Sequence, residues 1–142
     1  MDQRSPDGPA EALARLQDAL SRRDLEAFVA CFASDYRSEQ PVHPARVFAG
    51  RDRVRANWSA IFGGVPDFGS ELVASATDDT TAWAEWRWSG TRVDGAAYRR
   101  RGVTVFGVGS DGLIAWGRLY MEPVEEGGVG IEETIRRATG RA

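Results

Sequence analysis

The sequence predicts an α+β domain in which helices near the N-terminus cover a long antiparallel sheet. Two turn pairs, Asp94-Gly95 and Asp111-Gly112, are each flanked by runs rich in β-branched and aromatic residues. Such pairs are the strongest short-range signal for a β-hairpin. Residues 81–122 are therefore expected to form three consecutive antiparallel strands. Four of the five tryptophans lie in this stretch, so the sheet must bury at least one face.

The lengths of the two hairpin loops predict which side chains share a face. A two-residue loop at Asp94-Gly95 would pair Glu85 with Thr104, and a three-residue loop with a glycine bulge at residues 110–112 would pair Thr104 with Arg118. Cross-strand partners share a face, and a two-residue second loop would turn the last strand over. The first face is then expected to carry Trp83, Glu85, Arg87, Thr104, Phe106, Trp116, Arg118, Tyr120 and Glu122. The second is expected to carry Trp86, Trp88, Val103, Val105, Leu119 and Met121.

The two faces suggest different roles. Aromatic side chains mixed with a few charges are typical of a ligand pocket, so the first face is expected to line one. The second face is apolar throughout, which suits a subunit interface. We therefore expect a homodimer formed through Trp86, Trp88, Leu119 and Met121.

Composition narrows the classes of function. With 142 residues, the chain has the size of one globular domain, and its net charge of −3 argues against a general nucleic-acid-binding surface. All eighteen basic residues are arginine, which excludes a lysine Schiff base. The single Cys31 excludes an intramolecular disulfide and a multi-cysteine metal site. No apolar run approaches the length of a membrane span and no signal-peptide pattern is present, so we expect a soluble, cytoplasmic protein.

Helical spacing of apolar residues predicts three helices ahead of the long sheet. The first covers residues 9–22, the second begins at the N-cap Asp24, and the third opens at Asp52 and ends at Gly63-Gly64. Short strands are expected over residues 36–40 and 68–77, with a structured loop at 41–49 between prolines.

The domain is expected to occupy residues 9–125. Residues 1–8 are read as a disordered polar leader. Residues 126–142 combine a glycine-rich link with a short helix over 131–139. That helix either folds over the pocket mouth, reaches a neighbouring subunit, or is disordered.

Several short motifs together resemble the NTF2-like superfamily, in particular its SnoaL-like polyketide cyclase and limonene-epoxide hydrolase branch. They are Asp35-Tyr36, Gly50-Arg51-Asp52, Val105-Phe106, Asp111-Gly112-x-Ile114 and the run Arg118 to Glu122. The resemblance covers roughly residues 10–125. It implies an α+β cone, in which a curved mixed or antiparallel sheet wraps around three N-terminal helices and encloses a pocket. It also implies dimers formed through the outer face of the sheet.

The same resemblance suggests candidate catalytic residues. In the epoxide hydrolases, an acid at the end of the last strand acts as a base, and Glu122 occupies the corresponding place. Glu85 and Arg87 stand where an Arg-x-Asp pair is expected, but in the reverse order, and Glu39 stands where an asparagine holds water. The hydrolase pattern is therefore not met residue by residue. The His-Asp arrangement of the cyclases is not clearly present either, since His43 is the only histidine.

The first face suggests acid–base chemistry. We assign candidate catalytic roles to Glu122 and Glu85, one of which would serve as base and the other as acid, and to Arg118 and Arg87 as groups that stabilise negative charge. The alternative is a buried structural network of ion pairs that performs no chemistry. His43 is either an acid or base at the pocket mouth or a surface anchor. One histidine without a cysteine cluster argues against zinc, and no metal or cofactor is expected.

A flat hydrophobic ligand is expected because aromatic side chains are numerous, although about half of them would be plain core. The candidate binding residues are Tyr36, Glu39, His43, Trp58, Phe62, Phe68, Trp83, Phe106, Trp116 and Tyr120. The leading prediction is a cofactor-independent SnoaL-like enzyme of the cyclase, isomerase or hydrolase type, acting on a small hydrophobic molecule. The alternatives are a non-catalytic binding protein for such a molecule and an accessory dimerisation domain.

Overall fold

The computed structural model describes residues 8–141, so the expected leader lies outside the described residues except for Gly8. Helices and strands follow the order expected for an α+β domain. They are α1 (Pro9–Arg22), α2 (Leu25–Val29), β1 (Phe32–Glu39), the 3-10 turn η1 (Pro44–Arg46), β2 (Phe48–Ala49), α3 (Arg51–Gly64), β3 (Gly69–Asp78), β4 (Thr81–Thr91), β5 (Ala97–Val108), β6 (Ile114–Pro123) and α4 (Ile131–Thr139).

Local capping explains the start of the first two helices. Pro9 begins α1, and the carboxylate of Glu11 accepts a hydrogen bond from the backbone N–H of Gly8 at 3.0 Å. Asp24 caps α2 by accepting from the backbone N–H of Ala27 at 3.1 Å. Arg23, with a φ of 51°, ends α1 and turns the chain directly into α2.

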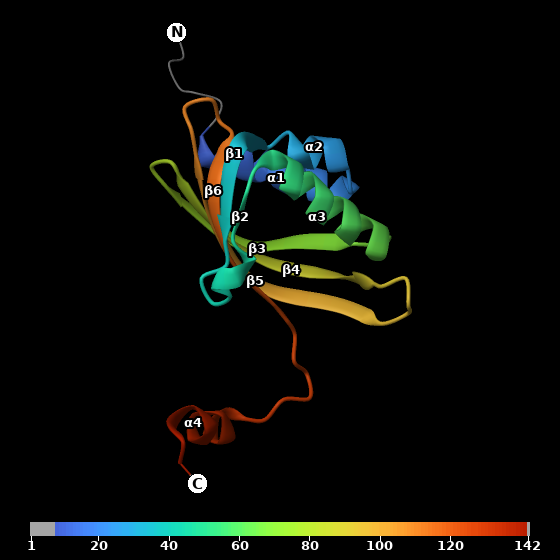
Figure 1. Ribbon diagram of the computed structural model, residues 1–142, viewed down its shortest axis with the longest axis vertical. Helices are drawn as coiled ribbons and strands as arrows, with labels where there is room; N and C mark the ends of the chain where they lie inside the picture. The colour runs from blue at the N-terminus through green and yellow to red at the C-terminus, as the bar shows by residue number, and fades with distance from the viewer. Residues whose placement is uncertain (1–7, 142) are drawn as a thin grey trace.

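One six-stranded sheet in the order β2-β1-β6-β5-β4-β3 forms the other layer. β1 runs parallel to β6, and the other neighbours are antiparallel. The sheet curves around α1, α2 and α3, which cover its concave face (Figure 1). The expected α+β cone with a mixed, curved sheet is confirmed. β1 begins at Phe32, earlier than expected, because parallel pairing with β6 extends it.

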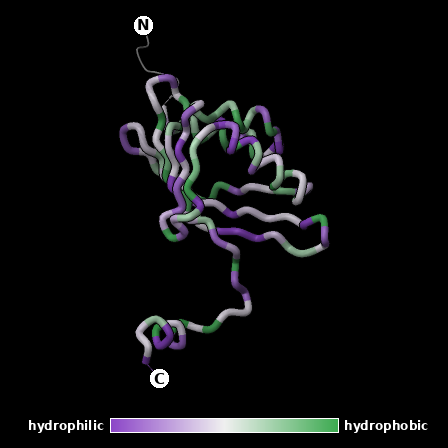
Figure 2. The backbone as a smooth tube through the Cα atoms, viewed as in Figure 1, coloured by the Kyte–Doolittle hydropathy of each residue, from purple (hydrophilic) through white to green (hydrophobic). Residues whose placement is uncertain are grey.

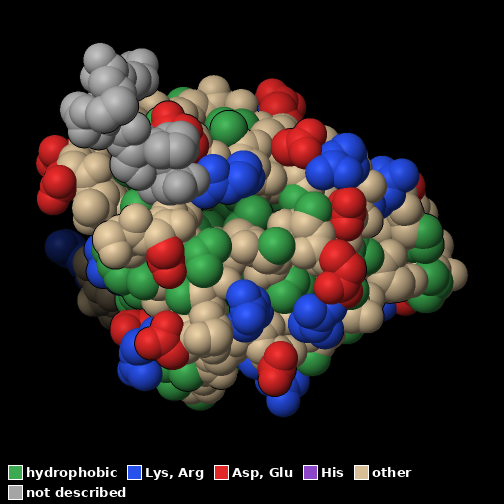
Figure 3. Space-filling view, turned by 90° about the horizontal axis from the view of Figure 1, so that it is seen from above, with side chains coloured by type: hydrophobic (Ala, Val, Ile, Leu, Met, Phe, Trp, Pro, Cys, Tyr) green, Lys and Arg blue, Asp and Glu red, His purple; other side chains and the backbone are tan. Residues whose placement is uncertain are grey.

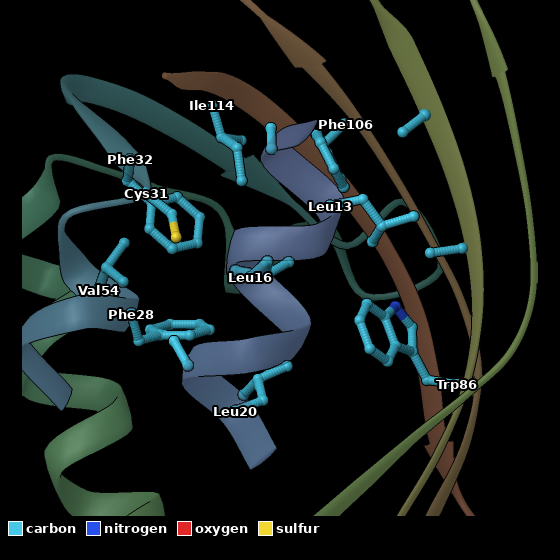
Figure 4. Close-up of a cluster of buried hydrophobic side chains, with 14 of the residues drawn as sticks. Leu13, Leu16, Leu20, Phe28, Cys31, Phe32, Val54, Trp86, Phe106 and Ile114 are labelled. Carbon is cyan, nitrogen blue, oxygen red and sulfur yellow. The ribbon is translucent and has the colours of Figure 1, made fainter. Parts of the chain in front are cut away.

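The core lies between α1 and the sheet on one side and between α1, α2 and β1 on the other. Leu13, Leu16 and Leu20 project from α1, with Trp86 and Phe106 on the side of the sheet (Figure 4). Phe28, Phe32 and Val54 lie on the opposite side of α1 (Figure 4). Hydrophobic and hydrophilic residues both occur along the covering helices, as amphipathic packing requires (Figure 2).

The predicted register of the first hairpin was wrong by one residue. The backbone N–H of Arg92 donates to the carbonyl of Ala96 at 2.8 Å, and Gly95 has a φ of 87°, so the loop contains three residues with a glycine bulge. As a result, Glu85 pairs with Val103 instead of Thr104.

The second hairpin has the expected three-residue loop, but its register is also shifted. The N–H of Gly109 donates to the carbonyl of Leu113 at 3.0 Å, as that loop requires. Val108 then pairs with Ile114, whereas Gly107 pairs with Trp116. The extra residue, Ala115, is a β-bulge that turns the remainder of β6 over.

Together the two shifts exchange the faces of β4 and β6. Thr104 and Phe106 still face the helices, but their neighbours there are Trp86, Trp88, Leu119 and Met121. Three of these, Trp86, Trp88 and Met121, are nearly inaccessible within the monomer. The expected location of the dimer interface on this face is therefore wrong. The charged and aromatic set of the first face, except Thr104 and Phe106, lies on the outer surface of the sheet.

Charged side chains of both signs are interspersed over the surface seen in Figure 3, with hydrophobic side chains between them. Among the described residues seen there, neither sign of charge forms an extended patch. Among residues 8–141, no helix combines the length and the apolar character needed to span a membrane.

The C-terminal helix α4 lies apart from the rest of the fold, beyond an extended link (Figure 1). Ile131 and Ile135 on this helix are 71% and 53% exposed. Its apolar face is therefore not covered by the domain.

Candidate functional site

A cavity of about 310 Å³ lies between the helices and the concave face of the sheet. This volume is at the lower end of the range for small-molecule sites. Most of the wall is aliphatic or aromatic: Leu16, Leu20, Phe28, Phe32, Phe48, Val54, Trp58, Ile61, Trp86, Trp88, Phe106, Ile114, Leu119 and Met121. Burial of an apolar ligand against such a wall is favourable because it removes apolar surface from water.

The polar part of the wall is small and carries no carboxylate or imidazole among the described residues. It comprises Tyr36, Ser38, Gln40, Arg46, Asn57, Tyr98, Arg100 and Thr104. The only charged side chains in this set are the two arginines. The cavity can therefore hold an apolar molecule and offer it hydrogen bonds and positive charge.

Tyr36 provides a hydroxyl inside the cavity. Its side chain is buried on β1, and the ring lies against Gly117 of β6, where a Cβ atom would be 2.5 Å from the Tyr36 hydroxyl oxygen. Burial raises the pKa of Tyr36, while a hydrogen bond with Ser38 opposes this effect. The phenol thus stays protonated near neutral pH and can donate a hydrogen bond to a ligand.

Two indole N–H groups of β4 have different environments. Trp86 Nε1 donates to Thr104 Oγ1 at 2.9 Å. Trp88 Nε1 is buried and has no hydrogen-bond partner among the described residues. The Trp88 ring meets Trp58 edge-on, with centroids 5.4 Å apart and an interplanar angle of 85°, so ring contacts surround it.

Both arginines of the cavity have neutral partners. Arg46 Nη1 donates to Gln40 Oε1 at 2.9 Å. The Arg100 guanidinium lies over the Tyr98 ring, 5.3 Å from its centroid. Burial raises the pKa of Tyr98, and the positive charge of Arg100 opposes that shift.

The structure does not bring three of the four predicted catalytic residues to the cavity. Glu85, Arg87 and Arg118 are exposed on the outer face of the sheet. Arg87 forms an ion pair of 2.8 Å with Glu71 on β3, and Arg118 lies over the Trp116 ring at 4.5 Å. These three side chains therefore form neither a convergent acid–base cluster nor the buried ion-pair network that was the alternative.

The fourth, Glu122, meets the only histidine. Glu122 Oε1 and His43 Nε2 are 2.5 Å apart, which joins the loop after β1 to the end of β6. Neither side chain lines the cavity, but Gln40 and Arg46 on either side of His43 do. The pair therefore lies near the rim of the cavity.

The predicted binding residues fall into three groups. Tyr36, Trp58 and Phe106 line the cavity. Phe62 and Phe68 belong to the aromatic cluster packed around Trp58 instead. The others lie outside the cavity wall: Glu39, His43, Trp83, Trp116 and Tyr120.

Trp86 and Trp88 line the cavity although they were expected at an interface. The signal that identifies their face is the alternation along residues 82–89, where Ala82, Ala84, Trp86 and Trp88 alternate with Trp83, Glu85, Arg87 and Ser89. Such alternation marks a strand with one buried face, and it places Glu85 and Arg87 on the solvent side. The lengths of the hairpin loops alone do not show this alternation.

Among the residues that the structure describes, no group of three or more His, Cys, Asp or Glu side chains could hold a metal ion. The helices, the curved sheet and the cavity between them define an α+β cone of NTF2-like type.

Comparison with known proteins agrees with this class. The family described as the SnoaL-like domain matches residues 13–116. The chain therefore belongs to the SnoaL-like domain family. None of the curated proteins compared with it matches.

Solved structures with this fold include proteins of different functions. A candidate SnoaL-like polyketide cyclase from Jannaschia sp. has a TM-score of 0.70 at 18% identity, over 86% of this chain and 92% of that one. A Mycobacterium tuberculosis protein in complex with estradiol-17β-hemisuccinate has a TM-score of 0.69 at 18% identity, over 82% and 94%. An epoxide hydrolase of the same organism, similar to limonene-epoxide hydrolase, has a TM-score of 0.66 at 20% identity, over 78% and 80%. These similarities establish the fold.

Proposed function

We propose that this chain binds a small, mainly apolar molecule in the cavity between its helices and its sheet. The observation that carries the proposal is the composition of the wall, which is largely aromatic and aliphatic with a few hydroxyl, amide and guanidinium groups. A structural neighbour in complex with a steroid derivative supports a ligand of this general class.

Binding is favoured over proton transfer inside the cavity because a general base must lie within hydrogen-bond reach of the proton that it abstracts. The described wall offers neutral and cationic groups but no carboxylate or imidazole. Tyr36 has a raised pKa and is therefore suited to donate a hydrogen bond rather than to accept a proton.

Calorimetric titration with a panel of flat hydrophobic molecules tests this proposal. Leu119→Trp places extra volume in the cavity wall and should abolish binding of any ligand found. The matched control Tyr120→Trp changes the adjacent residue on the outer face and should bind as the unmodified protein does. Circular dichroism checks that both variants are folded. Equal binding by a folded Leu119→Trp variant would place the ligand elsewhere and contradict the proposal.

A second candidate function is acid–base catalysis at the cavity rim, and the contact between His43 and Glu122 supports it. A carboxylate that accepts from one nitrogen of an imidazole orients the ring and leaves the other nitrogen to exchange a proton with a substrate. Mass spectrometry of a bound ligand after incubation would detect turnover. His43→Gln and Glu122→Gln should each stop turnover without preventing binding, whereas Glu125→Gln should have no effect. Unchanged turnover in both rim variants would exclude this role.

We also propose that the outer face of the sheet forms a homodimer. Trp83 and Tyr120 are 40% and 38% exposed there, so this face offers two large aromatic side chains to a second copy of the chain. Light scattering should give the mass of a dimer, and Trp83→Arg should convert it to a monomer. A monomeric unmodified protein would contradict the proposal.

A further inference from the structure

The cavity has a charge opposite in sign to that of the whole chain. The sequence contains 21 acidic and 18 basic residues, yet the described wall has two arginines and no acid. A positive site in a chain of net negative charge indicates that the charge at this place has a local purpose.

Both arginines lie toward one end of the cavity. Arg100 is on the inner face of β5, where it pairs with Pro123 of β6, two positions beyond the pair formed by Gly102 and Met121. Arg46 is on η1, in the loop that follows β1. β1 runs parallel to β6, with Glu39 paired to Arg118, so this loop lies beside the C-terminal part of β6.

The partners of these two guanidiniums leave their charge unbalanced. Arg46 contacts an amide oxygen and Arg100 contacts a phenol ring, and neither of these groups is negatively charged. Nearby arginines differ, since Arg99 pairs with Glu126 and Arg87 pairs with Glu71. A guanidinium has five N–H donors, so both side chains keep donors for another group.

We propose that the ligand of this cavity carries a carboxylate, which is held at the cavity mouth by Arg46 and Arg100 while its apolar body lies against the aromatic wall. This inference rests on the proposed binding function and specifies the class of ligand. A carboxylate can accept paired hydrogen bonds from a guanidinium, and such charge-assisted bonds are stronger than neutral ones. Arg100 is half-buried, which reduces the competition from water.

Matched pairs of ligands test the inference. Each pair consists of a carboxylic acid and the primary amide of the same apolar body, beginning with 2-naphthoic acid and 2-naphthamide. Calorimetry should show that the acid binds about ten-fold more tightly than the amide. Added salt should weaken binding of the acid and leave binding of the amide unchanged, because only the acid is held by charge–charge attraction.

Substitution of the arginines should remove this preference. Arg46→Gln and Arg100→Gln should each lower the affinity for the acid. The double variant should bind the acid and the amide with equal affinity. Arg100→Lys keeps the charge and should retain part of the preference. Arg101→Gln, which changes the adjacent outward-facing arginine of β5, is the matched control and should behave as the unmodified protein. Thermal melts verify that each variant is folded.

The outcomes separate this inference from the function on which it rests. If acids and amides bind with equal affinity, or if the double variant retains the preference for acids, the inference is overturned while the binding function stands. If no member of any pair binds, the proposed function fails as well.

Discussion

The indole N–H of Trp86 donates to the hydroxyl of Thr104 at 2.9 Å, across the strand pair β4 and β5 on the inner face of the sheet. Trp86 is 1% exposed, so water cannot replace this acceptor. The bond satisfies the one polar atom of a large core side chain and ties the cavity wall to the centre of the sheet.

Replacement of Thr104 by Val should therefore destabilise the protein by about 1–3 kcal/mol, because the buried indole N–H loses its partner. Thr104→Ser keeps the hydroxyl and should lose less stability. Chemical denaturation followed by circular dichroism measures both values. A Val variant as stable as the Ser variant would show that the bond contributes nothing.

The close approach of Tyr36 to Gly117 makes a second prediction. Gly117→Ala would place a Cβ atom 2.5 Å from the Tyr36 hydroxyl oxygen and should destabilise the protein by about 1–3 kcal/mol. Tyr36 is buried and has little room to move.

A double-mutant cycle tests the cause. With Tyr36→Phe, the nearest remaining ring atom would be Cζ at 3.4 Å, an ordinary contact. In the Tyr36→Phe background, Gly117→Ala should then lower the free energy of unfolding much less, as measured by denaturation. Equal cost in both backgrounds would show that some other contact is responsible.

Burial raises the pKa of the Cys31 thiol to about 11, and the positive charge of Arg15 opposes this only in part. Above pH 9 the thiol ionises in the unfolded chain while it stays protonated in the folded one. Release of this proton favours unfolding, so stability should fall by up to about 3 kcal/mol as the pH rises from 9 to about 11.

The control for this effect is Cys31→Ala. Its absolute stability will differ because packing changes, but its stability should decline less steeply over the same pH range. Denaturation at a series of pH values gives both slopes. Parallel curves for the two proteins would exclude Cys31 as the titrating group.

Removal of residues 128–142 should change the free energy of unfolding by less than about 0.5 kcal/mol. Among the described residues, the hydrogen bonds and ion pairs of α4 are all internal to residues 130–141, and the ion pair between Arg99 and Glu126 would be kept. Thermal melts measure the effect. A large loss would mean that α4 packs on the domain or on another subunit in solution.

Sequence reasoning located the helices and hairpins because their signals are local. Pro9, Asp24 and the glycines of the two turns act within a few residues of themselves. The parallel pairing of β1 with β6 joins segments far apart in the chain and has no such signal. The bulge at Ala115 also escaped prediction, although it decides which face of β6 is buried.

The site was predicted less well for the same reason. Of the predicted binding residues, Tyr36, Trp58 and Phe106 line the cavity, and their role in binding stays a prediction. Glu85 and Arg87 were placed on the wrong face because a one-residue error in register exchanges every side chain of a strand. Arg46 was not a candidate, because nothing in its immediate sequence distinguishes it from the other arginines. Arg100 belongs to the basic run Arg99-Arg100-Arg101, for which contact with an anionic ligand was only the lesser alternative to a solvated or ion-paired run.

The bulge on β6 has a consequence for related chains. A deletion of Ala115 would turn Arg118 and Glu122 toward the cavity and Met121 toward solvent. The number of residues between the second hairpin turn and the end of β6 thus decides which side chains face a ligand, as does the identity of those residues. Two chains of almost identical sequence that differ by one insertion at this position would present different interiors.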